Sequence, residues 1–449
     1  MEHAPMFKRT NLIAMTLVAA GAVALTGCGP TKAGKEARSQ AYDRMNLINA
    51  QVHYDQARQS FESGQFDKAL REINRAIARF SEAPPYYVIQ GRIYLETHQL
   101  EAALDSLNKA VELGEPKDEK SSIQPPVHVT DSQQEKLNTE KKETLAQAHY
   151  FAGIVFQRWS DDEQAYRRYL KAFEIQPTNA QYLLASAESL IALGEFEMAK
   201  QLVQPKMAYF EHNAALRQLQ GQIALLQGDP KQAAALYSEA RLLNPDDSAL
   251  LEQMMWAQYA AGMYGQCHES VKRLQQQERE SAGRGGQAGV RSDLIHLEAR
   301  CLNMMGRGPE ARELYIELTK LRPADPVAWT ELGSLAWDLG DYRRVAMCSV
   351  QIIALAPDRY EGYMFKGINE RHRGNLDEAV KLFRESSQLA TDIALPHLLL
   401  GQTLEQSGQV TQAQEAYAQA MKIEPNSVEA RELLRRLAEH QRLSAASSD

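Results

Sequence analysis

The stretch that decides the fold runs from Trp329 to Pro425 and reads WTELGSLAWDLGDYRRVAMCSVQIIALAPDRYEGYMFKGINERHRGNLDEAVKLFRESSQLATDIALPHLLLGQTLEQSGQVTQAQEAYAQAMKIEP. Within it Gly333, Gly367 and Gly401 recur at a constant step, because 367 − 333 = 34 and 401 − 367 = 34. The residues between these glycines place apolar side chains at helical spacing. A small residue repeated at this interval within helical segments is typical of an array of stacked helix pairs.

The same step continues towards the N-terminus, where small residues occupy nearly all of its positions. These positions are Ala57, Gly91, Gly153, Ala187, Gly221, Met255 and Ala299. Prolines keep the same interval, since 357 − 323 = 34 and 425 − 357 = 68, which is twice the step. This pattern resembles the tetratricopeptide repeat family, and the resemblance covers the chain from about residue 50 to residue 425. It implies an all-α fold, a right-handed α-solenoid of about ten helix pairs with a C-terminal capping helix.

Each position of the repeat has a physical role, which the last repeat illustrates. Gly401 and Ala420 are small, so that two antiparallel helices can approach each other closely. Gly408 suits the left-handed residue that ends a first helix, and Pro425 stops the second helix. Pro205 falls inside the second helix of the fourth repeat, where we expect a distortion.

The N-terminal residues have the pattern of a lipoprotein signal peptide. Lys8 and Arg9 precede an apolar run, Leu12–Leu25, that is 14 residues long (25 − 12 + 1) and too short to span a bilayer comfortably. The run ends in Leu25-Thr26-Gly27-Cys28, which resembles the lipobox of bacterial lipoproteins. This resemblance implies cleavage before Cys28 and lipid attachment to its thiol. An ordinary secretory signal with an incidental cysteine is the alternative.

Composition shifts and interruptions of the step predict eight segments. They are a signal peptide (1–27), a tether (28–40), an N-terminal repeat pair (41–114), a charged proline-containing insertion (115–143), a repeat block (144–276), a glycine-rich loop (277–291), a second repeat block (292–425) and a capping helix with a frayed tail (426–449). Within the insertion we expect a loop and then a lengthened helix from about Ser132, either solvated or in contact with a partner. Asn426 and Glu429 have the spacing of a capping box at the last helix.

The sequence favours a protein that is not an enzyme and that needs no cofactor. No zinc helix, nucleophile elbow or phosphate-binding loop occurs, so we expect neither catalytic residues nor a metal site. The formal charge of −8 argues against a nucleic-acid partner. Cys267, Cys301 and Cys348 are either small buried packing residues or, for Cys267 with Cys301, a disulfide in an oxidising compartment.

Protein binding is the function that the repeat pattern favours. The family resemblance implies that the first helices line a concave groove and that five positions of each first helix reach the ligand. In the sixth to ninth repeats these positions hold the candidate partner-binding residues Glu252, Trp256, Tyr259, His296, Arg300, Asn303, Trp337 and Arg371. Aromatic side chains beside arginine suit an extended peptide or a helix. Packing between repeats is the alternative role for Trp256 and Trp337.

These features together predict a membrane-anchored lipoprotein scaffold of the bacterial cell envelope. Two or three acyl chains hold a protein stably at a membrane. The resemblance to bacterial lipoproteins implies, from Gly29 after the lipid cysteine, a place at the outer membrane, facing the periplasm. In architecture the chain resembles pilotin-type and assembly lipoproteins that help build pili, secretin rings or exported polymers. A structural spacer that self-associates and a regulatory subunit of a membrane enzyme are the alternatives.

Overall fold

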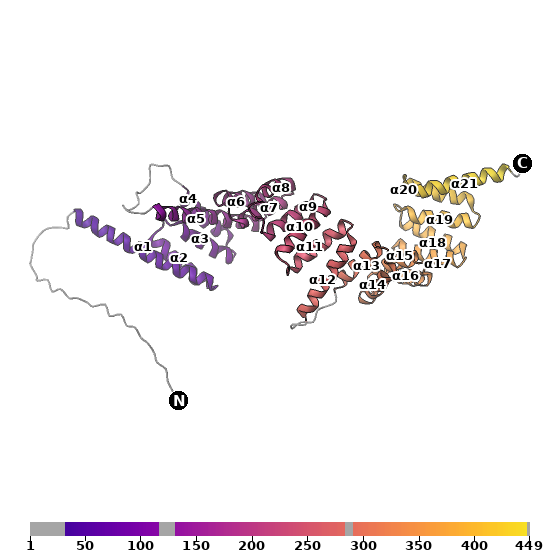
Figure 1. Cartoon of the computed structure of the whole chain (residues 1–449), viewed down its shortest axis with the longest axis horizontal. Helices are drawn as coiled ribbons and strands as arrows, with labels where there is room; N and C mark the ends of the chain where they lie inside the picture. Colours follow the sequence, from indigo (N-terminus) through magenta and orange to yellow (C-terminus); the bar gives the residue numbers. More distant parts are fainter. Residues whose placement is uncertain (1–31, 116–130, 283–290, 447–449) are drawn as a thin grey trace, which may run out of the picture. The chain divides into compact units, whose positions relative to one another are not determined.

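The computed structural model describes residues 32–115, 131–282 and 291–446 (Figure 1). Within these ranges the regular structure is helical and no strand occurs, which confirms the all-α prediction. None of the described helices combines the length and the apolar character that crossing a membrane requires. The predicted signal peptide, Cys28, the loop of the insertion and most of the glycine-rich loop lie outside the described residues.

The described part of the chain contains ten successive helix pairs, as the repeat pattern predicts. The first helices are α1 (Lys32–Glu62), α3 (Pro84–Glu96), α5 (Asp131–Arg158), α7 (Ala180–Ala192), α9 (Ala214–Leu226), α11 (Ser248–Ala260), α13 (Ser292–Met304), α15 (Pro326–Asp338), α17 (Tyr360–His372) and α19 (Ala394–Gln406). The second helices are α2 (Phe66–Arg79), α4 (Leu100–Gly114), α6 (Asp162–Ile175), α8 (Phe196–Val203), α10 (Pro230–Leu243), α12 (Tyr264–Ala282), α14 (Gly308–Leu321), α16 (Tyr342–Leu355), α18 (Leu376–Leu389) and α20 (Val410–Ile423). A single helix, α21 (Val428–Ala446), completes the array.

The chain divides into two compact units between Thr178 and Asn179. The first unit contains α1 to α6, and the second contains α7 to α21. Inside each unit successive helices pack against one another, and buried side chains between them form the core. The division falls inside the repeat block expected over 144–276.

Small residues let an aromatic ring fill the space between paired helices. A Cβ atom built on Gly401 of α19 would lie 2.4 Å from Cε1 of Tyr417 in α20. The same relation joins Gly153 to Tyr169, where the corresponding distance is 2.5 Å. Since real Cβ atoms do not approach other atoms this closely, the glycine is required for the ring to occupy its place.

Most first helices end at a glycine in the left-handed conformation. These glycines are Gly64, Gly194, Gly228, Gly262, Gly306, Gly340, Gly374 and Gly408. The second and third repeats differ, because the residue at this left-handed position is not glycine but His98 or Ser160, each with a φ of 59°. The left-handed region is sterically costly for a residue with a Cβ atom, so these two turns are strained.

We expect Ser160→Gly to stabilise the first unit by about 1 kcal/mol, because glycine removes the steric cost of the left-handed conformation. The measurement is hydrogen exchange of the amides in α5 and α6, which reports the local opening free energy. Gly340→Ser in the second unit is the reciprocal control, and it should lose a similar amount in α15 and α16. Unchanged exchange in both variants would show that this turn carries no strain.

Two local expectations are confirmed. Helix α8 stops at Val203, and a short 3₁₀ turn (Gln204–Lys206) follows, because Pro205 has no N–H to donate and its ring clashes with the preceding turn. The lengthened helix after the insertion is α5, which begins at Asp131, one residue before the expected start.

Two other expectations need correction. The segment predicted as a tether over 28–40 is helical from Lys32 onwards, because Ala, Lys, Glu and Arg are good helix formers even where residues 32–45 are exposed. The last helix is capped by Ser427 rather than by Asn426, since the Ser427 Oγ accepts a hydrogen bond from the amide of Ala430 at 3.3 Å. As expected of a capping helix, α21 buries apolar side chains, Ala430 and Leu437, against the core.

His149 on α5 is expected to make the first unit sensitive to acid. Its side chain is buried, and its Nδ1 has no hydrogen-bond partner within the described part of the chain. Burial, assisted by the charges of Arg168 and Lys171, lowers its pKa from 6.5 to about 4. Between these two values the unfolded state binds more protons than the folded state, so the stability of the unit falls as the pH drops through this window.

We expect the free energy of unfolding of the first unit to fall by about 2 kcal/mol more in the wild-type protein than in His149→Gln as the pH is lowered from about 7 to about 4. Urea denaturation at a series of pH values measures this difference. The carboxylates titrate in both proteins, so the difference between the two pH profiles gives the contribution of His149 alone. Parallel pH profiles for the two proteins would contradict the assignment.

Candidate partner-binding surface

The candidate residues lie on four first helices of the second unit. Helix α11 carries Glu252, Trp256 and Tyr259, helix α13 carries His296, Arg300 and Asn303, helix α15 carries Trp337 and helix α17 carries Arg371. We call these eight residues the first-helix surface. Their surroundings differ, and the structure separates a cluster around Arg300 from residues that take part in packing.

Two of the eight residues converge on one carboxylate that was not among the predicted site residues. The Nε of Arg300 and the Nε2 of His296 each lie 3.7 Å from Oε1 of Glu331 on α15. The guanidinium of Arg300 also lies over the ring of Tyr259, 5.5 Å from its centroid. Helices α11, α13 and α15 are thereby linked by a charged and aromatic cluster.

Glu331 organises this cluster electrostatically. His296 and the nearby charge of Arg300 lower its pKa, although burial acts in the opposite direction. The hydroxyl of Tyr315 on α14 donates a hydrogen bond to Oε2 of Glu331 at 3.2 Å. Burial, followed by the charge of Glu331, raises the pKa of Tyr315, so this hydroxyl stays protonated. At neutral pH the cluster therefore pairs an ionised carboxylate with the cation of Arg300.

Two members of the cluster are available to a partner. The Trp256 side chain is 44% exposed, and its ring contacts Tyr259 edge-on with centroids 6.5 Å apart. The Arg300 side chain is 45% exposed, whereas Glu331 is 28% exposed. An exposed indole and a guanidinium that both contact the ring of Tyr259 form the type of surface that anchors a protein partner.

The remaining candidates take part in contacts within the chain. Glu252 accepts hydrogen bonds from Arg291, with Oε1 2.8 Å from Nη2. Trp337 is half-buried and packs against the core of the C-terminal repeats. Arg371 lies over the Phe383 ring at 5.7 Å and donates to Oε1 of Gln402 at 3.2 Å.

These contacts fit the packing alternative for Trp337, and they leave Trp256 as the exposed aromatic residue of the surface.

Asn303 is half-buried on α13, one turn beyond Arg300. The family resemblance implies ligand contacts at five positions of each first helix, and Glu331, next to Leu332, occupies none of them. One signal in the sequence could have revealed Glu331. It is an acidic residue on a first helix that follows a first helix with two basic residues, His296 and Arg300.

The described cysteines are buried free thiols. Cys267 and Cys301 share one core cluster, and Cys348 belongs to the next one. All three have no exposed surface, as expected of small packing residues. Within the described ranges no group of three or more His, Cys, Asp or Glu side chains is placed to hold a metal ion.

Models of the family described as "Tetratricopeptide repeat" match residues 54–118 and 371–437. Comparison with curated protein sequences finds no match. Among solved structures the chain is similar to the APC/C hetero-tetramer Cut9-Hcn1, with 12% identity, coverage of 89% of this chain and 99% of the other, and a TM-score of 0.39. It is also similar to Pseudomonas aeruginosa pilF (20% identity, 57% and 98% coverage, TM-score 0.38) and to YrrB, a TPR protein with an unusual peptide-binding site (15% identity, 49% and 95% coverage, TM-score 0.35).

The family models match near both ends of the described chain, and helix pairs follow one another between them, with an unbroken step from Ala299 to Gly401. Glycine–aromatic contacts and left-handed glycines recur at the positions that the step predicts. Residues 54–118 and 371–437 therefore match tetratricopeptide repeats, and the described part of the chain is an all-α array of helix pairs of the kind that these repeats form.

Proposed function

We propose that this protein is a lipid-anchored scaffold of the bacterial cell envelope that binds another envelope protein through its first-helix surface. The tetratricopeptide repeat fold supports a scaffold for protein–protein interaction. The observation that carries the binding part of the proposal is the exposed Trp256 beside Tyr259 and Arg300. The process it serves is the assembly of an envelope complex such as a pilus, a secretin or a polymer exporter.

The geometry of the cluster favours one kind of partner. Trp256 offers an apolar face at low entropic cost, because an indole has few rotatable bonds. Arg300 keeps donors for a partner, since within the described ranges its one ion pair, with Glu331, is as long as 3.7 Å. A partner segment with a large apolar side chain next to a hydrogen-bond acceptor complements both groups, either as an extended strand or as a helix.

The membrane part of the proposal rests on the sequence around Cys28. A diacylglyceryl group on this thiol, together with an amide-linked chain such as palmitate, supplies the multiple acyl chains that stable anchoring needs. The exposed residues 32–45 at the start of α1 would then separate the repeats from the bilayer, on its periplasmic side at the outer membrane.

Cells that express Cys28→Ser should lose both lipid labelling and membrane retention of the protein. Metabolic labelling with an alkyne palmitate, followed by membrane fractionation, measures the two effects. Cys348→Ala removes a buried thiol of the second unit and is the control that should keep its label. A labelled Cys28→Ser protein, or a wild-type protein without label, would refute the anchor while leaving the binding surface untested by this experiment.

A further inference from the structure

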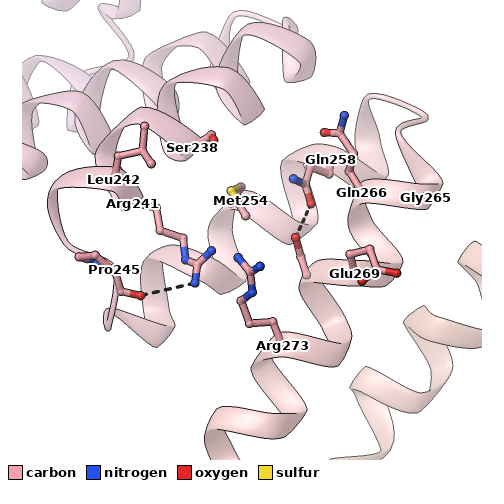
Figure 2. Close-up of a pocket in the computed structure, with 11 residues that line it drawn as sticks. Ser238, Arg241, Leu242, Pro245, Met254, Gln258, Gly265, Gln266, Glu269 and Arg273 are labelled. Atoms are coloured by element: carbon pink, nitrogen blue, oxygen red, sulfur yellow. Dashed lines mark hydrogen bonds between the residues drawn. The ribbon is translucent and has the colours of Figure 1, made fainter.

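A pocket on the second helices is lined by two arginines that form no ion pair within the described part of the chain. It has a volume of about 570 Å³ and lies between α10 and α12, with α11 as its floor (Figure 2). Its lining includes Arg241, Leu242, Met254, Gln258, Ser270 and Arg273. None of these residues belongs to the first-helix surface, so the pocket is a separate feature of the same unit.

Two arginines from different helices face each other in this pocket. Figure 2 shows the guanidinium groups of Arg241 and Arg273 pointing toward one another below Met254. Within the described ranges neither arginine forms an ion pair. Arg241 donates one long hydrogen bond, from Nη2 to the carbonyl oxygen of Pro245 at 3.4 Å, and its buried Nε has no partner. A buried donor without an acceptor is costly, so an acceptor that reached this Nε would be stabilised there.

The charges around the pocket favour a small anion. Burial, followed by the positive charge of Arg273, lowers the pKa of Arg241. Asp246 acts in the opposite direction on the same group, but it forms no ion pair with it in the described chain. An anion between the two guanidiniums would relieve their repulsion and satisfy the Nε of Arg241.

The walls of the pocket decide which anion fits. Met254, Leu242 and Pro245 supply apolar surface beside the arginines. Glu269 lines the far side, and Figure 2 shows its carboxylate turned away from the guanidiniums. This negative charge penalises a dianionic phosphate more than a monoanionic carboxylate. The hydroxyl of Ser270 donates to Oε1 of Gln258 at 2.8 Å, which fixes a polar wall opposite Arg241.

From this arrangement we propose that Arg241 and Arg273 bind the carboxylate of an Asp or Glu side chain that stands next to an apolar residue in a partner peptide. The carboxylate accepts hydrogen bonds from both guanidiniums, and the apolar neighbour packs on Leu242 and Met254. This site depends neither on the lipid anchor nor on the first-helix surface.

The test is an NMR titration of the full chain that follows the Arg241 Nε–Hε signal. The probe is the acetylated and amidated peptide Ala-Leu-Glu-Leu-Ala, and the matched control peptide has Gln in place of Glu. We expect a saturable shift with the Glu peptide and affinity at least tenfold weaker with the Gln peptide, because a charge-assisted bond is lost. Arg273→Gln changes an exposed residue and should weaken binding of the Glu peptide at least tenfold, because it also removes a charge-assisted hydrogen bond. Arg343→Gln on the surface of α16 should leave its affinity unchanged.

Each other result has a definite meaning. Tighter binding of inorganic phosphate than of the Glu peptide would overturn the carboxylate assignment. Equal affinity for the Glu and Gln peptides, or equal losses in Arg273→Gln and Arg343→Gln, would overturn the site. Thermal unfolding of each variant checks that the fold is intact.

Discussion

Gly401→Ala is expected to destabilise the C-terminal repeats by about 1–3 kcal/mol, although alanine is the better helix former by about 1 kcal/mol. The added Cβ would lie 2.4 Å from Cε1 and 2.5 Å from Cδ1 of Tyr417. The ring cannot easily move, because its side chain is fully buried and its hydroxyl donates to Oε2 of Glu405 at 2.9 Å. Glu405 is itself held by Arg436 of the capping helix, with 3.0 Å between Oε1 and Nη2. The packing cost therefore outweighs the gain in helix propensity.

Hydrogen exchange of α19, α20 and α21 measures this loss, together with the midpoint of urea unfolding. Gly265→Ala is the matched control, because a Cβ there would meet only the sulfur of Met305, at an ordinary contact distance of 3.8 Å. It should be neutral or slightly stabilising. Equal effects of the two substitutions would show that the glycine–tyrosine contact does not determine the packing of the last pair.

Trp256→Ala combined with Arg300→Ala should weaken partner binding at least 100-fold. Large exposed aromatic and arginine side chains dominate the binding energy of interfaces, and each truncation at such a site costs about 2 kcal/mol or more. Both side chains are nearly half exposed, so we expect the thermal unfolding midpoint of the variant to stay close to that of the wild type. The affinity is measured by calorimetry with the partner that the crosslinking experiment below identifies.

Val350→Ala combined with Arg343→Ala is the matched control for this variant, because both residues are exposed on the second helix α16. Glu331→Gln should have an intermediate effect, since it frees Arg300 but removes the charge that positions it. A full loss of binding in the α16 control would place the contact on the second helices and contradict our assignment.

Repeated local contacts made most of the fold predictable from sequence. Gly401 and Gly153 indicate the close approach of two helices within one repeat. Pro323, Pro357 and Pro425 each lie just past the end of a second helix. Such contacts involve residues at a fixed separation, so a constant step is enough to find them. The helical start at Lys32 was missed because a polar run rich in Lys and Gly also fits a tether.

The candidate site was only partly predictable, because its contacts join different repeats. Arg300 meets Glu331 from the next first helix, 31 positions along the chain (331 − 300) and outside the five positions considered. Arg241 and Arg273 face each other across an intervening helix, and no motif in the sequence marks their approach. Packing between repeats sets these contacts, and it depends on the curvature of the array rather than on local pattern.

The most direct test of the proposed scaffold is photo-crosslinking in intact cells, with a benzoylphenylalanine at position 256 on α11 or at position 350 on α16. We predict that position 256 captures one envelope protein, that Arg300→Ala abolishes this adduct, and that position 350 does not capture it. If both positions capture the same protein, or if position 256 crosslinks only to further copies of this chain, the first-helix surface is not the partner-binding site.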